Sequence, residues 1–569
     1  MSKLSTGKKI ALLALIIVVL FGMIYGGLVL IQSLNAMQEE NEPVTAENVG
    51  EKMTALLEQI NVVETEPRKA TITGSDILSE QDELPSIESY PLSVTNTTSH
   101  YIEIFSSPEK AGEGTDGWLN EVAEKFNAEK FTVNGEVVSV AVRSVSSGLA
   151  VDYITSGKYV PDAFTPSNEY WGAFVQAKGV QITKIADRLV GNTAGILISN
   201  DKYNELIQKY GAVNMKVITE ATSNNEIAMG YTNPFVSSTG LNFLVSTLYA
   251  YDADNLLSDT AIAGFQTFQK NVPLVSYNTL QMREAAESGS LDAFILEYQS
   301  YVNDPTLEAD YKFTAFGIRH DNPLYQIGKL SDEKTEILNL FSTYCLSEES
   351  QNLAAQYGFN GNENYKSELP QNIEGSQLVK AQSLYKENKD SGKAVMAVFV
   401  ADISGSMLGD PLNSLKTSLL NSMQYINSEN YIGLVSYNSK VYVNLPIGQF
   451  NLNQQAYFKG AVEDLDASGQ TATNDALLVA LNMLQEKLKE CPDAKPMIFL
   501  LSDGEQNTGY SLNDISGVLG TYEIPVYTIG YNANIAALQR ISEINEAATI
   551  DANSDDIVYQ LKNLFNSQM

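Results

Sequence analysis

Three oxygen-bearing side chains follow one apolar run at alternate positions. In the stretch VFVADISGSMLGDPLNSLK, residues 398–416, the apolar run ends at Asp402, and Ser404 and Ser406 come next. This spacing allows one loop to present a carboxylate and two hydroxyl groups to the same ion. The alternative interpretation is a polar loop that only starts a helix, because a proline suited to the first helical position follows it.

Two later segments carry further oxygen donors. Thr471 lies in DASGQTATNDAL, before a helical pattern, and Asp503 follows the apolar run IFLLS. Together with the first loop they supply two carboxylates and three hydroxyl groups, without His or Cys. Such a set suits a hard divalent cation and not zinc. We therefore predict Mg²⁺ as the bound ion, with Mn²⁺ or Ca²⁺ as alternatives.

The elements that must position these residues belong to a region over residues 393–569. Its strand-like runs lack polar alternation, which is typical of strands buried on both faces of a parallel sheet. The region is predicted to be a doubly wound, Rossmann-like α/β sheet, in which ligands bind beyond the carboxyl ends of the strands. Asp402 and Asp503 each stand at such an end. The predicted strands are 395–401, 431–437, 495–502 and 524–531, and the main helices are 410–427 and 473–490.

This region resembles von Willebrand factor A domains, and the match lies in the motif of their metal-ion-dependent adhesion site. The resemblance implies that the serines and the threonine coordinate the ion directly and that the aspartates do so directly or through water. It also implies an open coordination position for an Asp or Glu carboxylate of a protein partner. The family commonly has G-G-T where this chain has Gly469-Gln470-Thr471. The residues that match are Asp402, Ser404, Ser406, Thr471 and Asp503.

The middle region, residues 98–388, alternates strand-like runs with helical patterns and is long enough for two α/β lobes. Three of its strand-to-helix junctions, in IFSSPEK, SVSSGLA and FVSSTGL, carry paired serines. A helix start offers N–H donors, and neighbouring hydroxyl groups complete a cradle for an anion without Lys or Arg. Each pair taken alone is better explained as a helix cap, since Ser and Thr are the commonest caps.

Taken together, SSGLAVDYITSGKYVPDAFTPSN and TNPFVSSTGLNFL resemble type II periplasmic solute-binding proteins, in particular the branch that binds oxyanions. In that family, serine-rich helix starts from two lobes close on a ligand. The resemblance implies a small oxyanion or carboxylate as the solute. The candidate ligand-binding residues are Ser106, Ser107, Ser147, Ser167, Asn168, Ser238 and Thr239.

The N-terminus predicts a membrane anchor. Residues 10–32 are uncharged and long enough to cross a bilayer as a helix. Lysines precede this span and glutamates follow it, so residues 1–9 are expected in the cytoplasm and the bulk of the chain outside the cell. A cleaved secretory signal is the alternative. Residues 33–97 are acidic and polar and are expected to form an irregular tether with one possible short helix.

Composition narrows the function. The 569-residue chain has a net charge of −33, which argues against nucleic acid as a partner. It has neither a nucleophile–base arrangement typical of hydrolases nor a G-x-x-x-x-G-K-[ST] motif, so we do not expect an enzyme. The sequence predicts a single-pass surface protein that binds or senses. The alternative is an accessory subunit of a transport, chelatase-like or stress-resistance system.

Overall fold

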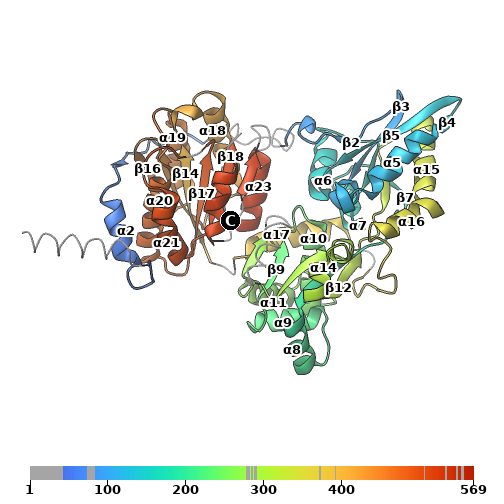
Figure 1. Cartoon of the computed structure of the whole chain (residues 1–569), viewed down its shortest axis with the longest axis horizontal. Coiled ribbons are helices and arrows are strands. Elements are labelled where there is room, and N and C mark those ends of the chain that lie inside the picture. Colours follow the sequence, from blue (N-terminus) through green and yellow to red (C-terminus); the bar gives the residue numbers. More distant parts are fainter. Residues whose placement is uncertain are drawn as a thin grey trace, which may run out of the picture.

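The computed structural model shows two α/β bodies side by side (Figure 1). The C-terminal body corresponds to the region predicted over residues 393–569, and the other to the predicted middle region. The predicted α/β class is therefore confirmed. The structure describes residues 43–72, 84–276, 282, 286, 291–370, 373–390, 393–504, 506–531, 535–545, 547, 549–552 and 557–569.

The C-terminal body is built on one sheet in the order β1-β16-β15-β14-β17-β18-β19. All eight residues of its central strand β14 are buried, because helices cover both faces of the sheet. Among the described strands of this sheet, β15 and β16 form an antiparallel pair and the other neighbours run parallel, so the predicted doubly wound sheet is present. The strands are β14 (Val395–Asp402), β15 (Tyr431–Tyr437), β16 (Val441–Gln449), β17 (Lys495–Ser502), β18 (Val526–Tyr531) and β19 (Thr549–Ala552).

The helices of this body divide between the two faces of the sheet. One apolar core lies beneath α18 (Asp410–Ser422), α19 (Leu452–Glu463) and α23 (Ile557–Gln568). The other core lies beneath the helices that pack on the opposite face. Those are α20 (Thr473–Leu488), α21 (Leu512–Tyr522) and α22 (Ile535–Ser542).

Two elements of the N-terminal stretch belong to this same body. Strand β1 (Val62–Glu64) pairs in parallel with β16 at the edge of the sheet, and helix α2 (Val49–Leu57) packs against α20 and α21. Val49 and Met53, four residues apart on one face of α2, enter the second core. The possible short helix expected in this stretch is present as α2. The stretch is not an irregular tether here, because β1 also joins the sheet. That pairing was not expected, since a three-residue strand leaves little periodicity in the sequence.

The middle body lies in the chain between β1 and β14, and it has two lobes. The first lobe holds a sheet in the order β2-β5-β3-β6-β13-β7, and the second lobe holds a sheet in the order β10-β9-β11-β8-β12. The chain passes from the first lobe to the second between β7 and β8 and returns between β12 and β13. Strand β2 (Leu92–Val94) pairs with β5, so the first lobe begins before the predicted boundary at residue 98.

The bounds of the middle strands follow the predicted alternation. In the first lobe they are β3 (His100–Ser106), β4 (Thr132–Val133), β5 (Glu136–Ser144), β6 (Ala163–Thr165), β7 (Ile182–Ala186) and β13 (Leu324–Ile327). In the second lobe they are β8 (Thr193–Ser199), β9 (Met229–Thr232), β10 (Leu274–Ser276), β11 (Ala293–Glu297) and β12 (Tyr311–Arg319).

Helices cover the sheets of both lobes. Those of the first lobe are α4 (Pro108–Ala111), α5 (Trp118–Glu129), α6 (Ser147–Ser156), α7 (Glu169–Ala177), α15 (Asp332–Cys345) and α16 (Glu348–Gln356). Those of the second lobe are α8 (Asn200–Tyr210), α9 (Met215–Ser223), α10 (Ser238–Tyr251), α11 (Asp259–Gln269), α13 (Tyr298–Val302) and α14 (Pro305–Asp310). Helix α17 (Gly375–Asn388) then packs against α7 of the first lobe and α10 and α11 of the second.

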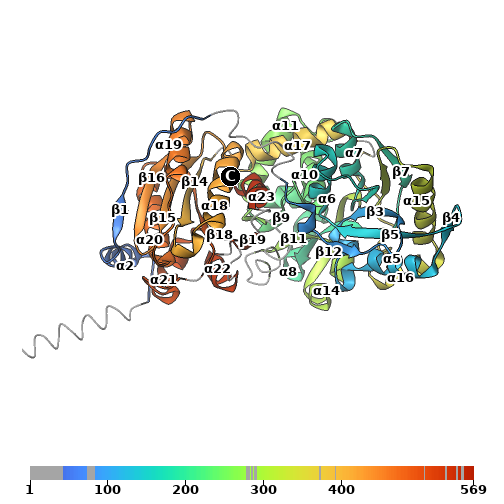
Figure 2. The same ribbon diagram turned by 90° about the horizontal axis from the view of Figure 1, so that it is seen from above.

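Helix α23 joins the two bodies, and Figure 2 shows it between them. Phe565 packs against two phenylalanines of the C-terminal sheet, whereas Tyr559 belongs to the core of the middle body. The side chain of Asn233 donates a hydrogen bond to the Asn563 carbonyl at 3.2 Å. Gln568 donates to the Val275 carbonyl at 2.8 Å. One helix therefore contributes to both bodies.

The membrane span predicted over residues 10–32 lies outside the described residues. Among the helices that the structure does describe, none combines the length and the apolar character that crossing a bilayer would need.

Candidate functional site

Asp402 ends the buried strand β14, and its carboxylate is held by neighbours on three segments. The Ser404 amide donates to Oδ1 at 2.8 Å, and the Ser502 hydroxyl donates to Oδ2 at 2.6 Å. The Tyr437 hydroxyl lies 3.3 Å from the same Oδ2. Strands β15 and β17 flank β14, so their ends supply Tyr437 and Ser502. The carboxylate therefore has a fixed orientation.

The two serines of the motif meet the second aspartate. Ser404 Oγ lies 3.1 Å from Ser406 Oγ, and the Ser406 hydroxyl donates to Asp503 Oδ1 at 3.0 Å. Ser404 is buried and Ser406 is exposed, so this group of side chains opens to solvent at Ser406. The structure thus brings together four of the five residues predicted to bind metal.

Thr471, the fifth predicted residue, is buried in a loop that touches both other segments. The amide of Gly405 donates to the Gly469 carbonyl at 3.0 Å, which ties this loop to the first segment. Asn507, four residues beyond Asp503, accepts from the Thr471 amide at 2.9 Å. Gly469 has a φ of +81°, a backbone conformation that favours glycine. Gln470, which stands where the family commonly has a second glycine, does not have a positive φ, so its side chain causes no backbone strain.

The charges at this cluster suit a cation. Burial raises the pKa of both Asp402 and Asp503, and the charge of Asp503 raises the pKa of Asp402 further. Within the described part of the chain, no Lys, Arg or His forms an ion pair with either carboxylate. No group of three or more His, Cys, Asp or Glu side chains placed to hold a metal occurs there either. A hard divalent cation fits this set of two carboxylates and neighbouring hydroxyl groups.

The second candidate site lies where the two lobes meet. Ser238, at the start of α10 in the second lobe, has its Oγ 3.0 Å from Ser167 Oγ and 3.4 Å from Ser147 Oγ in the first lobe. The Trp171 indole donates to Ser238 Oγ at 2.8 Å. All three serines are buried. The structure therefore gathers these predicted residues into one group, in which they bond to one another.

The lobes also approach each other through their backbones beside these serines. A Cβ at Gly148 would lie 2.5 Å from the Phe235 carbonyl oxygen and 2.9 Å from the Val236 Cα, both in the second lobe. Only a glycine permits this approach. The structure is therefore that of closed lobes.

Asn168 and Thr239, also predicted, contact a buried network around Glu297. Asn168 Nδ2 lies 3.1 Å from His320 Nε2, and the Thr239 hydroxyl donates to Glu297 Oε1 at 3.3 Å. His320 Nδ1 lies 2.7 Å from the same carboxylate oxygen. Asn192 donates to the other oxygen. Nothing in the sequence around Glu297 or His320 indicated this role, because the two residues meet only when β11 and β12 are placed in one sheet.

Ser106 and Ser107 form a neighbouring but separate group. Among the described residues, no hydrogen bond joins either of them to the serines at the lobe junction. The Ser107 hydroxyl instead receives a hydrogen bond from Lys110 Nζ, which is fully buried. A cationic side chain, not considered in the sequence analysis, therefore stands beside one of the three predicted serine pairs. Lys110 was missed because the four-residue helix α4 has no recognisable pattern.

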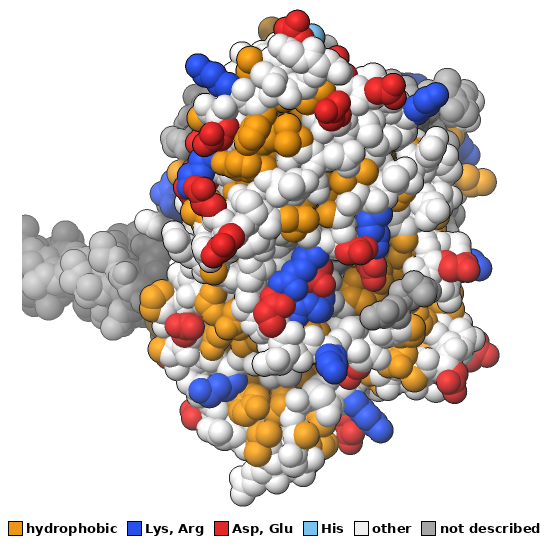
Figure 3. Space-filling model, turned by 90° about the vertical axis from the view of Figure 1, so that its right-hand side faces the viewer, with side chains coloured by type: hydrophobic (Ala, Val, Ile, Leu, Met, Phe, Trp, Pro, Cys, Tyr) orange, Lys and Arg blue, Asp and Glu red, His pale blue; other side chains and the backbone are white. Residues whose placement is uncertain are grey.

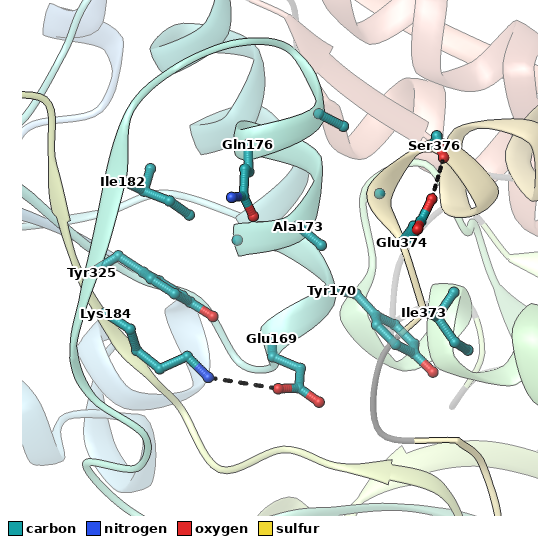
Figure 4. Close-up of a pocket in the computed structure, with 13 residues that line it drawn as sticks. Glu169, Tyr170, Ala173, Gln176, Ile182, Lys184, Tyr325, Ile373, Glu374 and Ser376 are labelled. Carbon is teal, nitrogen blue, oxygen red and sulfur yellow. Dashed lines mark hydrogen bonds and ion pairs between the residues drawn. The ribbon is translucent and has the colours of Figure 1, made fainter.

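A cavity of about 560 Å³ lies elsewhere in the first lobe, between α7, β7 and the start of α17 (Figure 4). Tyr170, Tyr325 and an ion pair between Lys184 and Glu169, with Nζ 3.8 Å from Oε2, line it. The seven predicted solute-binding residues do not line this cavity, so it is distinct from the serine group.

Charges on the outer face of the middle body are mixed. Basic side chains stand beside acidic ones on the face shown in Figure 3, so the described residues there form no basic patch. Such a surface does not favour nucleic acid binding.

Comparisons with known proteins detect two classes of domain in this chain. Residues 397–566 match the family model of the von Willebrand factor type A domain. Residues 111–360 match the model of bacterial extracellular solute-binding proteins. The two domain classes predicted from the sequence are therefore confirmed, and together they support a binding or accessory role.

Among individual relatives, inter-alpha-trypsin inhibitor heavy chain H3 of Bos taurus is 28% identical over 150 residues, which are 24% of this chain and 16% of that protein. An uncharacterized protein of Synechocystis sp. is 31% identical over 136 residues, or 23% of this chain and 31% of that one. This chain thus covers less than a third of either relative. Among solved structures, a periplasmic thiamin binding protein has a TM-score of 0.38 and 12% identity, over 52% of this chain and 98% of that chain.

Proposed function

We propose that the C-terminal body binds a divalent cation, Mg²⁺ foremost and otherwise Mn²⁺ or Ca²⁺, and through it captures an Asp or Glu carboxylate of a protein partner. The observation that carries this proposal is the hydrogen-bonded group of Ser404, Ser406 and Asp503, which opens to solvent and has no cationic partner among the described residues. Asp402, Ser404, Ser406, Thr471 and Asp503 would hold the ion.

The division of labour follows from burial. Asp402, oriented by Ser502 and Tyr437, fixes the Ser404 amide, while the exposed Ser406 faces the incoming partner. The bound cation supplies positive charge for the partner's carboxylate. Neutral hydroxyl ligands leave more of that charge uncompensated than carboxylates would. This favours a site for reversible capture over a closed structural cage.

The location of this activity is part of the proposal. The uncharged stretch over residues 10–32 supports a single membrane-spanning anchor with residues 1–9 in the cytoplasm. The two bodies would then lie outside the cell, at its surface. The same arrangement suits an accessory subunit of a transport, chelatase-like or stress-resistance system, which is the alternative role.

A second binding function is favoured for the middle body. The convergence of Ser147, Ser167 and Ser238 with the Trp171 indole supports binding of a small oxyanion or carboxylate between the lobes. Hydroxyl and N–H donors can replace the hydration shell of such an anion. Because these groups bond to one another in the closed lobes, the lobes must part for the solute to enter.

Calorimetric titration of the full chain with Mn²⁺ tests the metal proposal. Wild type and the control Asp410→Asn, which changes an exposed carboxylate near the motif, are expected to bind one ion with the same affinity. Ser404→Ala removes a proposed ligand without changing the charge and is expected to weaken binding at least tenfold. Equal binding by Ser404→Ala and wild type would refute the proposed site.

A further inference from the structure

A lysine is buried at the carboxyl ends of β3 and β6. Lys110 is fully inaccessible, and its Nζ donates to the Thr165 carbonyl at 2.7 Å and to Ser107 Oγ. The nearest carboxylate oxygen, on Glu109, lies 3.8 Å away. A buried ammonium group is costly unless it is paired and fully hydrogen-bonded. Its position therefore calls for an explanation beyond packing.

Two polar groups at this point have unused capacity. An ammonium group carries three N–H donors, and hydrogen bonds to two acceptors account for two of them. The hydroxyl of Thr165 is buried and has no hydrogen-bond partner. Buried polar atoms in native proteins are nearly always satisfied, so such an atom points to a ligand or water.

These groups belong to the same strand ends as the serines at the lobe junction. Thr165 ends β6, and Ser167 follows two residues later in the loop that leads to α7. Beyond the carboxyl ends of the strands is where open α/β sheets bind ligands. A ligand held by Ser147, Ser167 and Ser238 would therefore lie close to Lys110.

We propose that Lys110 and Thr165 recognise the charge of the solute, with one anionic oxygen of that solute bound by the Lys110 ammonium and the Thr165 hydroxyl. This inference rests on the proposed solute binding and adds a specificity determinant to it. A full positive charge at this point selects anions over neutral solutes of the same shape. It also offsets the negative charge of Glu297, which would otherwise repel an anion between the lobes.

The charge of Lys110 makes the expected binding depend on pH. Burial lowers the pKa of Lys110 to about 8, against the opposing influence of Glu109 and Glu297. The other titratable group in this network is His320, which is bonded to Glu297. As pH rises through about 8, an empty site loses the lysine proton, so anion affinity is expected to fall.

The test is a thermal-shift and calorimetric titration of the full chain with sulfate, phosphate, molybdate, tellurite, acetate and succinate. The inorganic oxyanions and the carboxylates are tested as two separate groups of probes, so the result shows which of the two classes of anion the protein binds. The variants are Lys110→Met, Thr165→Val and the control Lys216→Met, which removes an exposed lysine from α9.

We expect wild type and the control to bind the same anion, and Lys110→Met to bind it at least tenfold more weakly without a lower melting temperature in the absence of anion. The melting temperature measured without anion separates weaker binding from a loss of folded protein. Thr165→Val should weaken binding severalfold. Full affinity in Lys110→Met would overturn the role of Lys110 and leave solute binding intact. No binding of any probe by wild type would overturn both.

Discussion

The two candidate sites differ in how many rigid parts must come together to form them. The predicted metal ligands project from one edge of a single sheet, and backbone hydrogen bonds tie their three loops together. The predicted solute ligands come from two lobes, and they meet only because the lobes are closed. A site on one sheet is preorganised, whereas a site between two lobes forms when the lobes close and is lost when they open.

The same difference decides what each group of side chains does without a ligand. Ser406 and Asp503 stay partly accessible to solvent, so a cation can reach them directly. Ser147 and Ser238 are buried and use their hydroxyl groups on each other. The proposed metal site should therefore tolerate changes in the middle body, while the proposed solute site should respond to any change at the junction of its lobes.

The largest expected effect is that of Gly148→Val. A Cβ at this position meets backbone atoms of the second lobe at 2.5 and 2.9 Å, and backbone cannot move aside as a side chain can. We expect the free energy of unfolding of the middle body to fall by about 3 kcal/mol or more. Urea unfolding followed by tryptophan fluorescence measures it, since both tryptophans lie in the first lobe.

The matched control for that variant is Gly50→Ala, since a Cβ at Gly50 in α2 meets no atom within 4 Å. Gly148→Val should leave Mn²⁺ binding unchanged. A weaker Mn²⁺ affinity in this variant would show that the two sites depend on each other.

The next effect concerns Lys110 and depends on pH. Its pKa is lowered from 10.5 to about 8 in the folded protein, so between these values the unfolded chain binds the extra proton. The free energy of unfolding of the wild type therefore increases as the pH rises from about 8 to 10.5. Relative to wild type, Lys110→Met should be more stable by up to about 3 kcal/mol below pH 8, with the difference vanishing near pH 10.5. Chemical unfolding of both proteins at pH 7, 9 and 10 measures this difference in stability. A difference that does not vary with pH would contradict the lowered pKa of Lys110.

Met53→Ala tests whether the N-terminal stretch belongs to the C-terminal body. Met53 is 5% exposed and packs in the second core of that body. Truncation of a buried methionine costs about 2–5 kcal/mol, so the C-terminal body should lose stability while the lobes do not. Hydrogen exchange of β14 and of β3 separates the two bodies. Glu51→Ala, which changes an exposed residue on the same helix, serves as control. Equal protection of the β14 amides from hydrogen exchange in both variants would contradict the assignment of α2 to this body.

The smallest effect is expected from Trp171→Phe. The change removes the indole N–H that donates to Ser238 Oγ at 2.8 Å but keeps an aromatic ring in place. Loss of one neutral hydrogen bond across the lobes costs about 1 kcal/mol. Urea unfolding detects this against Tyr249→Phe, which removes one hydroxyl group from an aromatic side chain of α10 and keeps its ring. A stability equal to that of the control would show that this contact does not hold the lobes closed.

Local patterns predicted the α/β class of both bodies and four side chains that meet at the end of β14, whereas they did not predict contacts between distant segments. Asp402, Ser404 and Ser406 were predictable because their spacing is that of one loop, and Asp503 because an apolar strand precedes it. The contacts of Glu297 were not predictable, because they form only when β11 and β12 lie in one sheet, and those of Lys110 were not, because α4 is too short to give a pattern. The pairing of β1 with β16 joins residues nearly 400 positions apart and leaves no mark in either segment.

Anomalous diffraction from crystals of the protein soaked in Mn²⁺ tests whether the residues at the end of β14 hold a divalent cation. We expect a manganese peak bounded by Ser404, Ser406 and Asp503, with Thr471 among its ligands and a coordination position open to solvent. The same crystals soaked with a short acidic peptide should show a carboxylate oxygen in that position. A manganese peak elsewhere with none at these residues would contradict the proposed metal site. An ion fully enclosed by protein ligands would contradict the proposed capture of a partner's carboxylate.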